Sequence, residues 1–130
     1  MSKSVRLATA IEILVYMAKH LPQPVTTKDI AMSLQQHPAR VRQLVSDLVK
    51  KGILSTTRGT GGGSSLARMP AEITLEDIYL AVEEQSVLSV FTHDSKEQDD
   101  LLEQINTLFD IFENKLMNDM RSYSLTYFLD

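Results

Sequence analysis

The sequence predicts a mainly α-helical protein with one small β-hairpin, and two observations underlie this expectation. Apolar residues recur three and four positions apart along most of the 130-residue chain, which is the repeat of amphipathic helices. One glycine-rich run, residues 59–63, separates two short stretches that have the composition of strands. With 43% hydrophobic residues, the chain can form one compact core and a protruding helix, and it is too short for two ordinary domains.

The first helix is predicted over residues 4–20, because Ile11 and Leu14 share one face and Pro22 follows. Glu12 interrupts this apolar stretch, and no run approaches the roughly 18 consecutive apolar residues of a membrane span. No small-residue cleavage site follows, so a signal peptide is not expected. The absence of cysteine agrees with a reducing compartment. We therefore expect a cytoplasmic protein with no membrane segment.

Two short helices joined by a tight turn are predicted next. Thr26 or Thr27 would cap a helix over residues 28–34, and Pro38 suits the first turn of the next helix. Gly52 is the expected C-terminal stop of that helix. Its inward residues recur at helical spacing and are Val41, Leu44, Val45 and Leu48.

The glycine-rich run is predicted to be the turn of a hairpin whose strands cover residues 53–57 and 65–67. The same glycines could instead bind the phosphates of a nucleotide. Such a loop needs a helix directly after the glycines, and a Walker-type loop also needs a lysine, whereas Gly63 is followed by Ser64 and Ser65. The hairpin interpretation is therefore preferred, and no catalytic residues and no cofactor are expected.

The C-terminal part is predicted to contain a helix that opens after Thr74, a polar linker at residues 84–95, and one long helix. Ser95 and Gln98 fit a capping box for the long helix, whose apolar repeat continues to Tyr127. A helix of about 30 residues spans roughly 45 Å, more than the N-terminal part can cover. We therefore expect its apolar face to pack on a second copy, with packing on its own head as the alternative. The expected dimerisation residues are Leu101, Ile105, Leu108, Phe109, Phe112, Leu116 and Met120.

Charged residues are distributed unevenly along the chain. Residues 1–70 contain ten Lys or Arg and three Asp or Glu, whereas residues 71–130 contain three and fourteen. A basic half joined to an acidic half is expected where one end of a protein binds phosphates. Chance clustering of charged residues on solvent-exposed faces is the alternative explanation. The overall net charge of −4 therefore does not exclude a nucleic-acid-binding protein.

The order helix, tight polar turn, second helix and glycine hairpin is typical of a winged helix-turn-helix. The second helix of such a pair enters the major groove of double-stranded DNA, where Arg reads guanine, Gln reads adenine and small side chains allow close approach. Arg58, at the base of the hairpin, suits the minor groove or its phosphates. A solvated surface is the plainer alternative for the arginines. The expected DNA-binding residues are Thr27, Lys28, His37, Pro38, Ala39, Arg40, Arg42, Gln43, Ser46, Arg58, Gly59, Thr60, Gly61 and Gly62.

Three stretches of the chain carry a family resemblance. Residues 48–55, the run 58–62 with Leu66 and Ala67, and residues 70–83 resemble, in residue type and spacing, the signature of the Rrf2 family of bacterial repressors. The resemblance covers most of the chain up to residue 83 and, more loosely, the last helix. It implies a homodimer that is joined through that helix and binds a partly palindromic operator, with one recognition helix and one wing per half-site.

The chain departs from the family pattern in two ways. Iron–sulfur members carry three cysteines before the long helix, and this chain has none, so it resembles the cysteine-free branch, of the CymR or YwnA kind. Many members have Tyr-Leu-Glu-Gln where this chain has Arg-Val-Arg-Gln at residues 40–43, so no target sequence carries over. His93, Asp94 and Glu97 could in principle bind a metal ion. A solvent-exposed linker is the favoured interpretation of this segment, so no metal is expected.

We accordingly expect a DNA-binding domain at residues 1–83, a linker and candidate regulatory region at residues 84–95, and a dimerisation helix at residues 96–130. A small-molecule effector or a partner protein that acts on this linker would change the spacing of the two recognition helices. The alternative function is a winged-helix module that binds protein. In that case, substitution of the candidate arginines would leave DNA binding unchanged.

Overall fold

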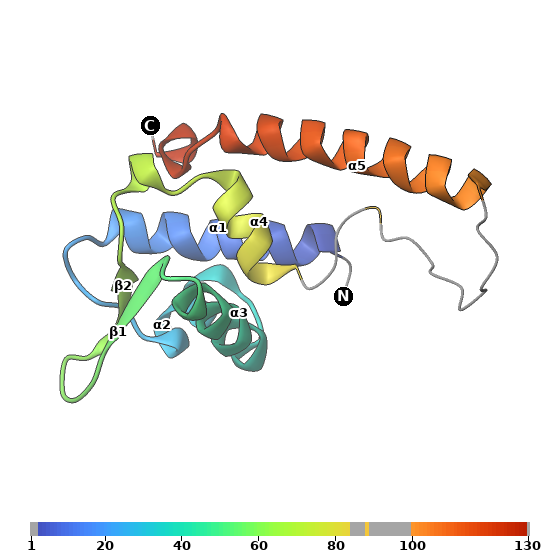
Figure 1. Cartoon of the computed structure of the whole chain (residues 1–130). Coiled ribbons are helices and arrows are strands. Elements are labelled where there is room, and N and C mark those ends of the chain that lie inside the picture. The colour runs from blue at the N-terminus through green and yellow to red at the C-terminus, as the bar shows by residue number, and fades with distance from the viewer. Residues whose placement is uncertain (1–2, 84–87, 89–99, 130) are drawn as a thin grey trace.

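The computed structural model describes residues 3–83, 88 and 100–129, and it consists of an N-terminal head with a long helix lying across it (Figure 1). The mainly helical architecture with one hairpin agrees with the sequence prediction. In chain order the elements are α1 (Lys3–Lys19), α2 (Thr27–Leu34), α3 (Pro38–Lys50), β1 (Leu54–Thr57), β2 (Gly63–Leu66), the 3-10 helix η1 (Pro70–Glu72), α4 (Leu75–Val82), α5 (Asp100–Arg121) and the 3-10 helix η2 (Leu125–Phe128).

The core of the head forms where α1 meets α2, α3 and α4. Ile13, Leu14 and Met17 of α1 are almost completely buried, together with Leu44 and Leu48 of α3. The inward face of α1 is therefore rotated from the predicted one, because Ile11, which was expected to face inward, is only half-buried. Tertiary packing on two sides of the helix, rather than the local repeat alone, decides which residues of α1 are covered.

The junction between α3 and the hairpin is a Schellman motif centred on Gly52. Gly52 has a backbone φ of +74°, and its N–H donates to the carbonyl of Val49 at 3.0 Å. The N–H of Ile53 reaches back to the carbonyl of Leu48 at 3.0 Å. Glycine adopts this left-handed conformation at little cost, so it fixes the angle at which the chain leaves α3 and enters the hairpin.

The hairpin begins its second strand earlier than predicted, at Gly63 rather than Ser65. β1 and β2 are antiparallel, with Leu54 opposite Leu66. Val25 and Ser64 add an isolated bridge, in which each N–H donates to the other carbonyl at 2.9 and 2.8 Å. This bridge ties the hairpin to the segment between α1 and α2. The earlier start of β2 comes from its pairing with β1, in which Gly63 lies opposite Thr57.

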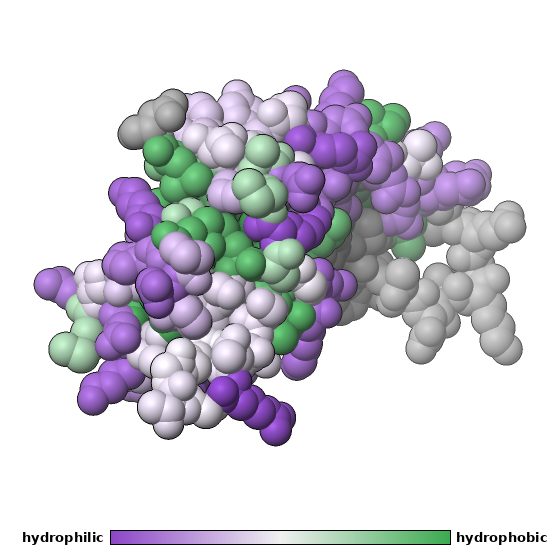
Figure 2. All heavy atoms as spheres, turned by 90° about the vertical axis from the view of Figure 1, so that its left-hand side faces the viewer, coloured by the Kyte–Doolittle hydropathy of each residue, from purple (hydrophilic) through white to green (hydrophobic). Residues whose placement is uncertain are grey.

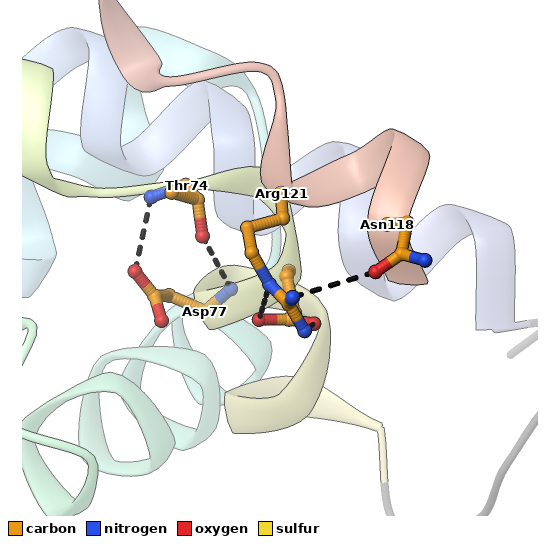
Figure 3. A network of polar contacts seen from close by, with 5 residues as sticks. Thr74, Asp77, Asn118 and Arg121 are labelled. Atoms are coloured by element: carbon orange, nitrogen blue, oxygen red, sulfur yellow. Dashed lines mark hydrogen bonds and ion pairs between the residues drawn. The ribbon is translucent and has the colours of Figure 1, made fainter. Parts of the chain in front are cut away.

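A polar network joins α4 to α5 (Figure 3). Thr74 and Asp77 form a capping box at the start of α4, with hydrogen bonds of 3.1 and 3.0 Å between side chain and backbone. The guanidinium of Arg121, the last residue of α5, lies against the Glu76 carboxylate in the first turn of α4, with one contact of 2.6 Å. The end of the long helix is thereby attached to the head.

The long helix is shorter than predicted, and its predicted continuation to Tyr127 is wrong. α5 contains 22 residues and ends at Arg121, after which the chain returns to the head. The N–H of Leu75 donates to the carbonyl of Tyr123 at 2.9 Å, and the N–H of Leu125 donates to the carbonyl of Ile73 at 2.8 Å. Leu125 is completely buried. The chain therefore forms no further turn of α5 after Arg121. Burial of Leu125 and these two backbone hydrogen bonds to the head stabilise the returning segment instead.

Candidate DNA interface

The helix-turn-helix consists of α2, a three-residue connection and α3. Thr26 is the N-cap of α2, where its hydroxyl accepts from the N–H of Asp29 at 3.1 Å. Gln35 ends the helix in a left-handed conformation, with φ of +53°, which turns the chain sharply toward α3. Two of the predicted site residues, Thr27 and Lys28, therefore lie in the first turn of α2, where Thr27 is half-buried and Lys28 is exposed.

His37 and Pro38 shape the start of α3. His37 is the N-cap, and its Nδ1 accepts a hydrogen bond from the N–H of Ala39 at 3.1 Å. Pro38 occupies the first turn, where its missing N–H leaves no helical hydrogen bond unmade. The imidazole ring is exposed, so Nε2 remains available as a donor to a phosphate. The sequence predicts that His37 contacts DNA, and the structure shows that it also caps α3.

The outer face of α3 carries the predicted recognition residues. Val41, Leu44, Val45 and Leu48 are buried, as expected. Arg40 is half-buried at the edge of the outer face. Four exposed residues of the predicted set recur at helical spacing along α3 and form one stripe, namely Ala39, Arg42, Gln43 and Ser46.

The hairpin tip presents a small, exposed loop. Arg58, Gly59, Thr60 and Gly61 are exposed and Gly62 is half-buried. A Cβ atom on Gly62 would lie 2.3 Å from the carbonyl oxygen of Thr57. The tight turn therefore needs glycine at this position for steric reasons, and the turn presents Arg58 at the edge of the tip.

The recognition helix and the hairpin lie on the same side of the molecule. Figure 1 shows α3 and the hairpin tip at the bottom of the view, and α5 at the top. In Figure 2, which faces the left-hand side of Figure 1, hydrophilic and neutral residues cover most of the lower part, and a hydrophobic patch lies near the middle of the view with hydrophilic residues above it. The elements predicted to contact DNA thus share one polar side of the head.

The basic residues on this side of the head differ in ion pairing from the arginines elsewhere in the described structure. Arg6, Arg68 and Arg121 each form an ion pair with a carboxylate. Within the described ranges, no ion pair is formed by the basic residues of the proposed interface, namely Lys28, Arg40, Arg42 and Arg58. Unpaired cations on one face are available for DNA phosphates.

Two further residues of this region were not predicted from the sequence. Asp47 lies on α3 and contacts both Gln43 on the same helix and Arg6 on α1. The spacing of Gln43 and Asp47 could have indicated their contact, because residues four apart are neighbours on a helix. Nothing local indicates the contact with Arg6, which lies 41 positions away.

The apolar residues of α5 are only partly covered. No residue of the helix is buried. Ile105, Phe109 and Met120 are half-buried. The side that faces solvent includes four of the predicted dimerisation residues together with Ile111, with exposures between 37% and 62%: Leu101, Leu108, Ile111, Phe112 and Leu116.

The predicted linker, residues 84–95, lies outside the described residues except for Leu88, and so do the proposed cap of α5 and the histidine-containing segment. Among the residues that the structure describes, no group of three or more metal-binding side chains occurs. No helix in this part of the chain is long and apolar enough to cross a membrane.

Comparison with known proteins agrees with this arrangement. The Rrf2 family, described as "Iron-dependent Transcriptional regulator", matches residues 3–130. Two regulators of Bacillus subtilis strain 168, both named as HTH-type, are similar in sequence. YwnA is 37% identical over 83 residues, which cover 64% of this chain and 60% of YwnA. YwgB is 31% identical over 130 residues, which cover 93% of this chain and 80% of YwgB.

A solved structure has the same fold. The chain superimposes on CymR (YrzC), the global cysteine regulator of B. subtilis, with a TM-score of 0.68 and 23% identity, over 93% of this chain and 90% of CymR. The chain has no cysteine, so it has no thiolate ligands of its own for an iron–sulfur cluster. The winged helix-turn-helix, the match over residues 3–130 and the similarity to YwgB together establish that this chain belongs to the Rrf2 family of bacterial DNA-binding transcriptional regulators, without cysteine ligands for an iron–sulfur cluster.

Proposed function

We propose that this regulator is a cytoplasmic repressor that binds a partly palindromic operator as a homodimer. In each half-site, α3 enters the major groove, and the hairpin tip contacts the adjacent minor groove or its phosphates. Arg42, Gln43 and Ser46 face the base edges, while Lys28 and Arg58 face the backbone. Occupation of the operator blocks transcription.

The observation that carries this proposal is the set of cations without carboxylate partners on α2, α3 and the hairpin tip. Cations that lie beside a recognition helix attract phosphates and release counterions from DNA. The chain as a whole is acidic, with a net charge of −4. A general attraction to DNA is therefore not expected, and binding must come from this face.

The proposed dimer rests on α5. Its exposed apolar residues, which include Leu108 and Phe112, would be covered by the same helix of a second copy. A two-fold arrangement of two heads also matches the two-fold symmetry of a palindromic operator.

The signal is proposed to enter through the segment that joins the head to α5, residues 84–100. A small-molecule effector or a partner protein bound there would change the angle between the two heads, and hence the spacing of the two recognition helices. An iron–sulfur cluster with cysteine ligands is not part of this mechanism, because the chain has no cysteine.

The test is binding of the purified protein to its own upstream intergenic DNA across a salt series. Arg58→Ala is compared with wild type, and Lys19→Ala, which removes an exposed cation from α1, is the control. Specific, steeply salt-dependent binding that Arg58→Ala weakens and Lys19→Ala leaves unchanged supports the proposal. Equal, weak binding to this DNA and to random DNA, unaffected by Arg58→Ala, would instead favour a protein-binding module.

A further inference from the structure

Asp47 contacts two side chains at once, one through each oxygen of its carboxylate. Its Oδ2 lies 3.3 Å from Nη2 of Arg6, and its Oδ1 accepts a hydrogen bond from Nε2 of Gln43 at 3.1 Å. The side chains of Arg6 and Asp47 are 24% and 15% exposed, respectively, so this ion pair is partly shielded from water. Gln43 itself lies on the exposed stripe of α3.

We propose that Asp47 is a positioning residue that fixes the orientation of the Gln43 amide and thereby sets the base that Gln43 reads. The inference rests on the proposed function, since it requires that α3 enters the major groove. It concerns a residue that does not itself belong to the predicted set of DNA contacts.

The two ends of the Gln43 amide differ in their hydrogen bonding. Nε2 of glutamine carries two hydrogens and Oε1 accepts, while an ionised carboxylate only accepts. Asp47 therefore attracts the N–H end of Gln43 and repels the oxygen end. One N–H is used on Asp47, and the second N–H and Oε1 remain for a base edge. These are the donor and the acceptor that a bidentate contact with adenine N7 and N6 requires.

Arg6 completes the arrangement from outside the recognition helix. It lies on α1, and its guanidinium holds Oδ2 of Asp47, which leaves Oδ1 for Gln43. An ionised carboxylate has no hydrogen that it could donate to Oε1 of Gln43. A rotation of the Gln43 amide by half a turn would place two acceptors against each other and is therefore suppressed.

The test is a selection of bound duplexes from a pool with a randomised half-site, carried out with full-length wild type, Gln43→Ala, Asp47→Ala and the double variant. Gln43→Ala identifies the base pair that Gln43 reads, where wild type should show a preference of roughly tenfold. Asp47→Ala is expected to lower this preference to roughly twofold at the same base pair. It should leave the other positions and the salt dependence of binding unchanged.

The double variant separates positioning from a general structural role. In the Gln43→Ala background, Asp47→Ala should change the base preference no further, because the amide that it orients is gone. A structural role would weaken binding to all sequences alike, in both backgrounds. Asp47→Asn keeps an oxygen that can accept a hydrogen bond from Gln43. The base preference of this variant at the Gln43 base pair should therefore lie between those of wild type and Asp47→Ala. Asp47→Asn also serves as the second variant if Asp47→Ala does not fold.

The two proposals fail in different ways. If the wild type enriches no sequence from the pool, the proposed operator binding is wrong. If the wild type enriches a sequence and Asp47→Ala or Asp47→Asn selects it with an unchanged preference at the Gln43 base pair, the operator binding stands and the positioning role of Asp47 is overturned.

Discussion

The guanidinium of Arg121 donates two hydrogen bonds to the carboxylate of Glu76, from Nε to Oε1 at 3.0 Å and from Nη2 to Oε2 at 2.6 Å (Figure 3). This paired geometry joins the last residue of α5 to the first turn of α4. It is a strong form of the arginine–carboxylate contact, because two parallel hydrogen bonds fix the orientation of both groups.

The pair predicts a pH-dependent contribution to stability. The hydrogen bonds from Arg121 hold the pKa of Glu76 below its ordinary value of 4.5, and they raise the pKa of Arg121. The contribution is therefore fully present above pH 4.5 and is lost as the pH falls through the lowered pKa of Glu76. Arg121→Ala should lower the Tm by a few degrees at neutral pH, since the guanidinium is largely exposed, and the difference from wild type should vanish in acid.

Thermal unfolding by circular dichroism at several pH values measures this effect. Lys19→Ala, which removes an exposed cation from α1, is the control, and its difference in Tm from wild type should not change as the pH falls through the lowered pKa of Glu76. A difference between Arg121→Ala and wild type that stays constant down to the lowest pH at which both proteins fold would contradict the assignment to Glu76.

Arg42 should contribute directly to DNA affinity. It is exposed in the middle of the recognition stripe and forms no ion pair with the described residues. Arg42→Ala is expected to cost about 1–3 kcal/mol of specific binding free energy, measured by fluorescence anisotropy on the upstream DNA. If the loss is confined to one base pair, Arg42 reads a base, and if it is equal for all sequences, Arg42 binds phosphate. No loss on any DNA would remove Arg42 from the interface.

Gly62 should be required for the shape of the hairpin tip. A Cβ atom at this position would meet the carbonyl oxygens of Thr57 at 2.3 Å and Gly59 at 2.8 Å, so Gly62→Ala must distort the turn. We expect weaker operator binding, with the helical content unchanged. Thr60→Ala, in the exposed part of the same loop, is the control for stability. Wild-type affinity of Gly62→Ala would show that the tip does not contact DNA.

The exposed face of α5 predicts the oligomeric state. Light scattering coupled to gel filtration should give twice the chain mass of 14.6 kDa for the wild type. Leu108 and Phe112 are both 47% exposed, and the double variant Leu108→Glu/Phe112→Glu should be a monomer with weakened operator binding. Asn114→Glu changes the opposite side of the helix and should remain a dimer. A wild-type protein that is monomeric at all concentrations would contradict the proposed dimer.

Leu125 should anchor the C-terminal segment. It is completely buried, and its N–H is bonded to the carbonyl of Ile73. Leu125→Ala is expected to lower the free energy of unfolding by about 2–5 kcal/mol, measured by urea denaturation. The exposed Tyr127 in the same segment provides the control, since Tyr127→Ala should cost much less. Similar, small losses for both variants would mean that the segment adds little to the core.

The recognition helix was predictable because its determinants are local. The apolar repeat from Val41 to Leu48 specifies which side of α3 is buried, and Pro38 and Gly52 mark its ends. The stripe that contains Arg42 and Gln43 follows as the opposite side of the same helix. The hairpin followed equally from its glycines, although pairing of Gly63 with Thr57 starts its second strand earlier than predicted.

The sequence by itself thus determined the order of the elements, the buried residues and most of the exposed residues of α3, and the absence of thiolate ligands, because periodicity, capping and composition act within a few residues. Only the tertiary structure decided that the chain turns back after Arg121, whose guanidinium reaches Glu76, and that Arg6 holds Asp47 beside Gln43. The Arg6–Asp47 and Glu76–Arg121 pairs span 41 and 45 positions of the chain. No local pattern specifies such contacts, because they arise only when packing of the core brings distant helices together.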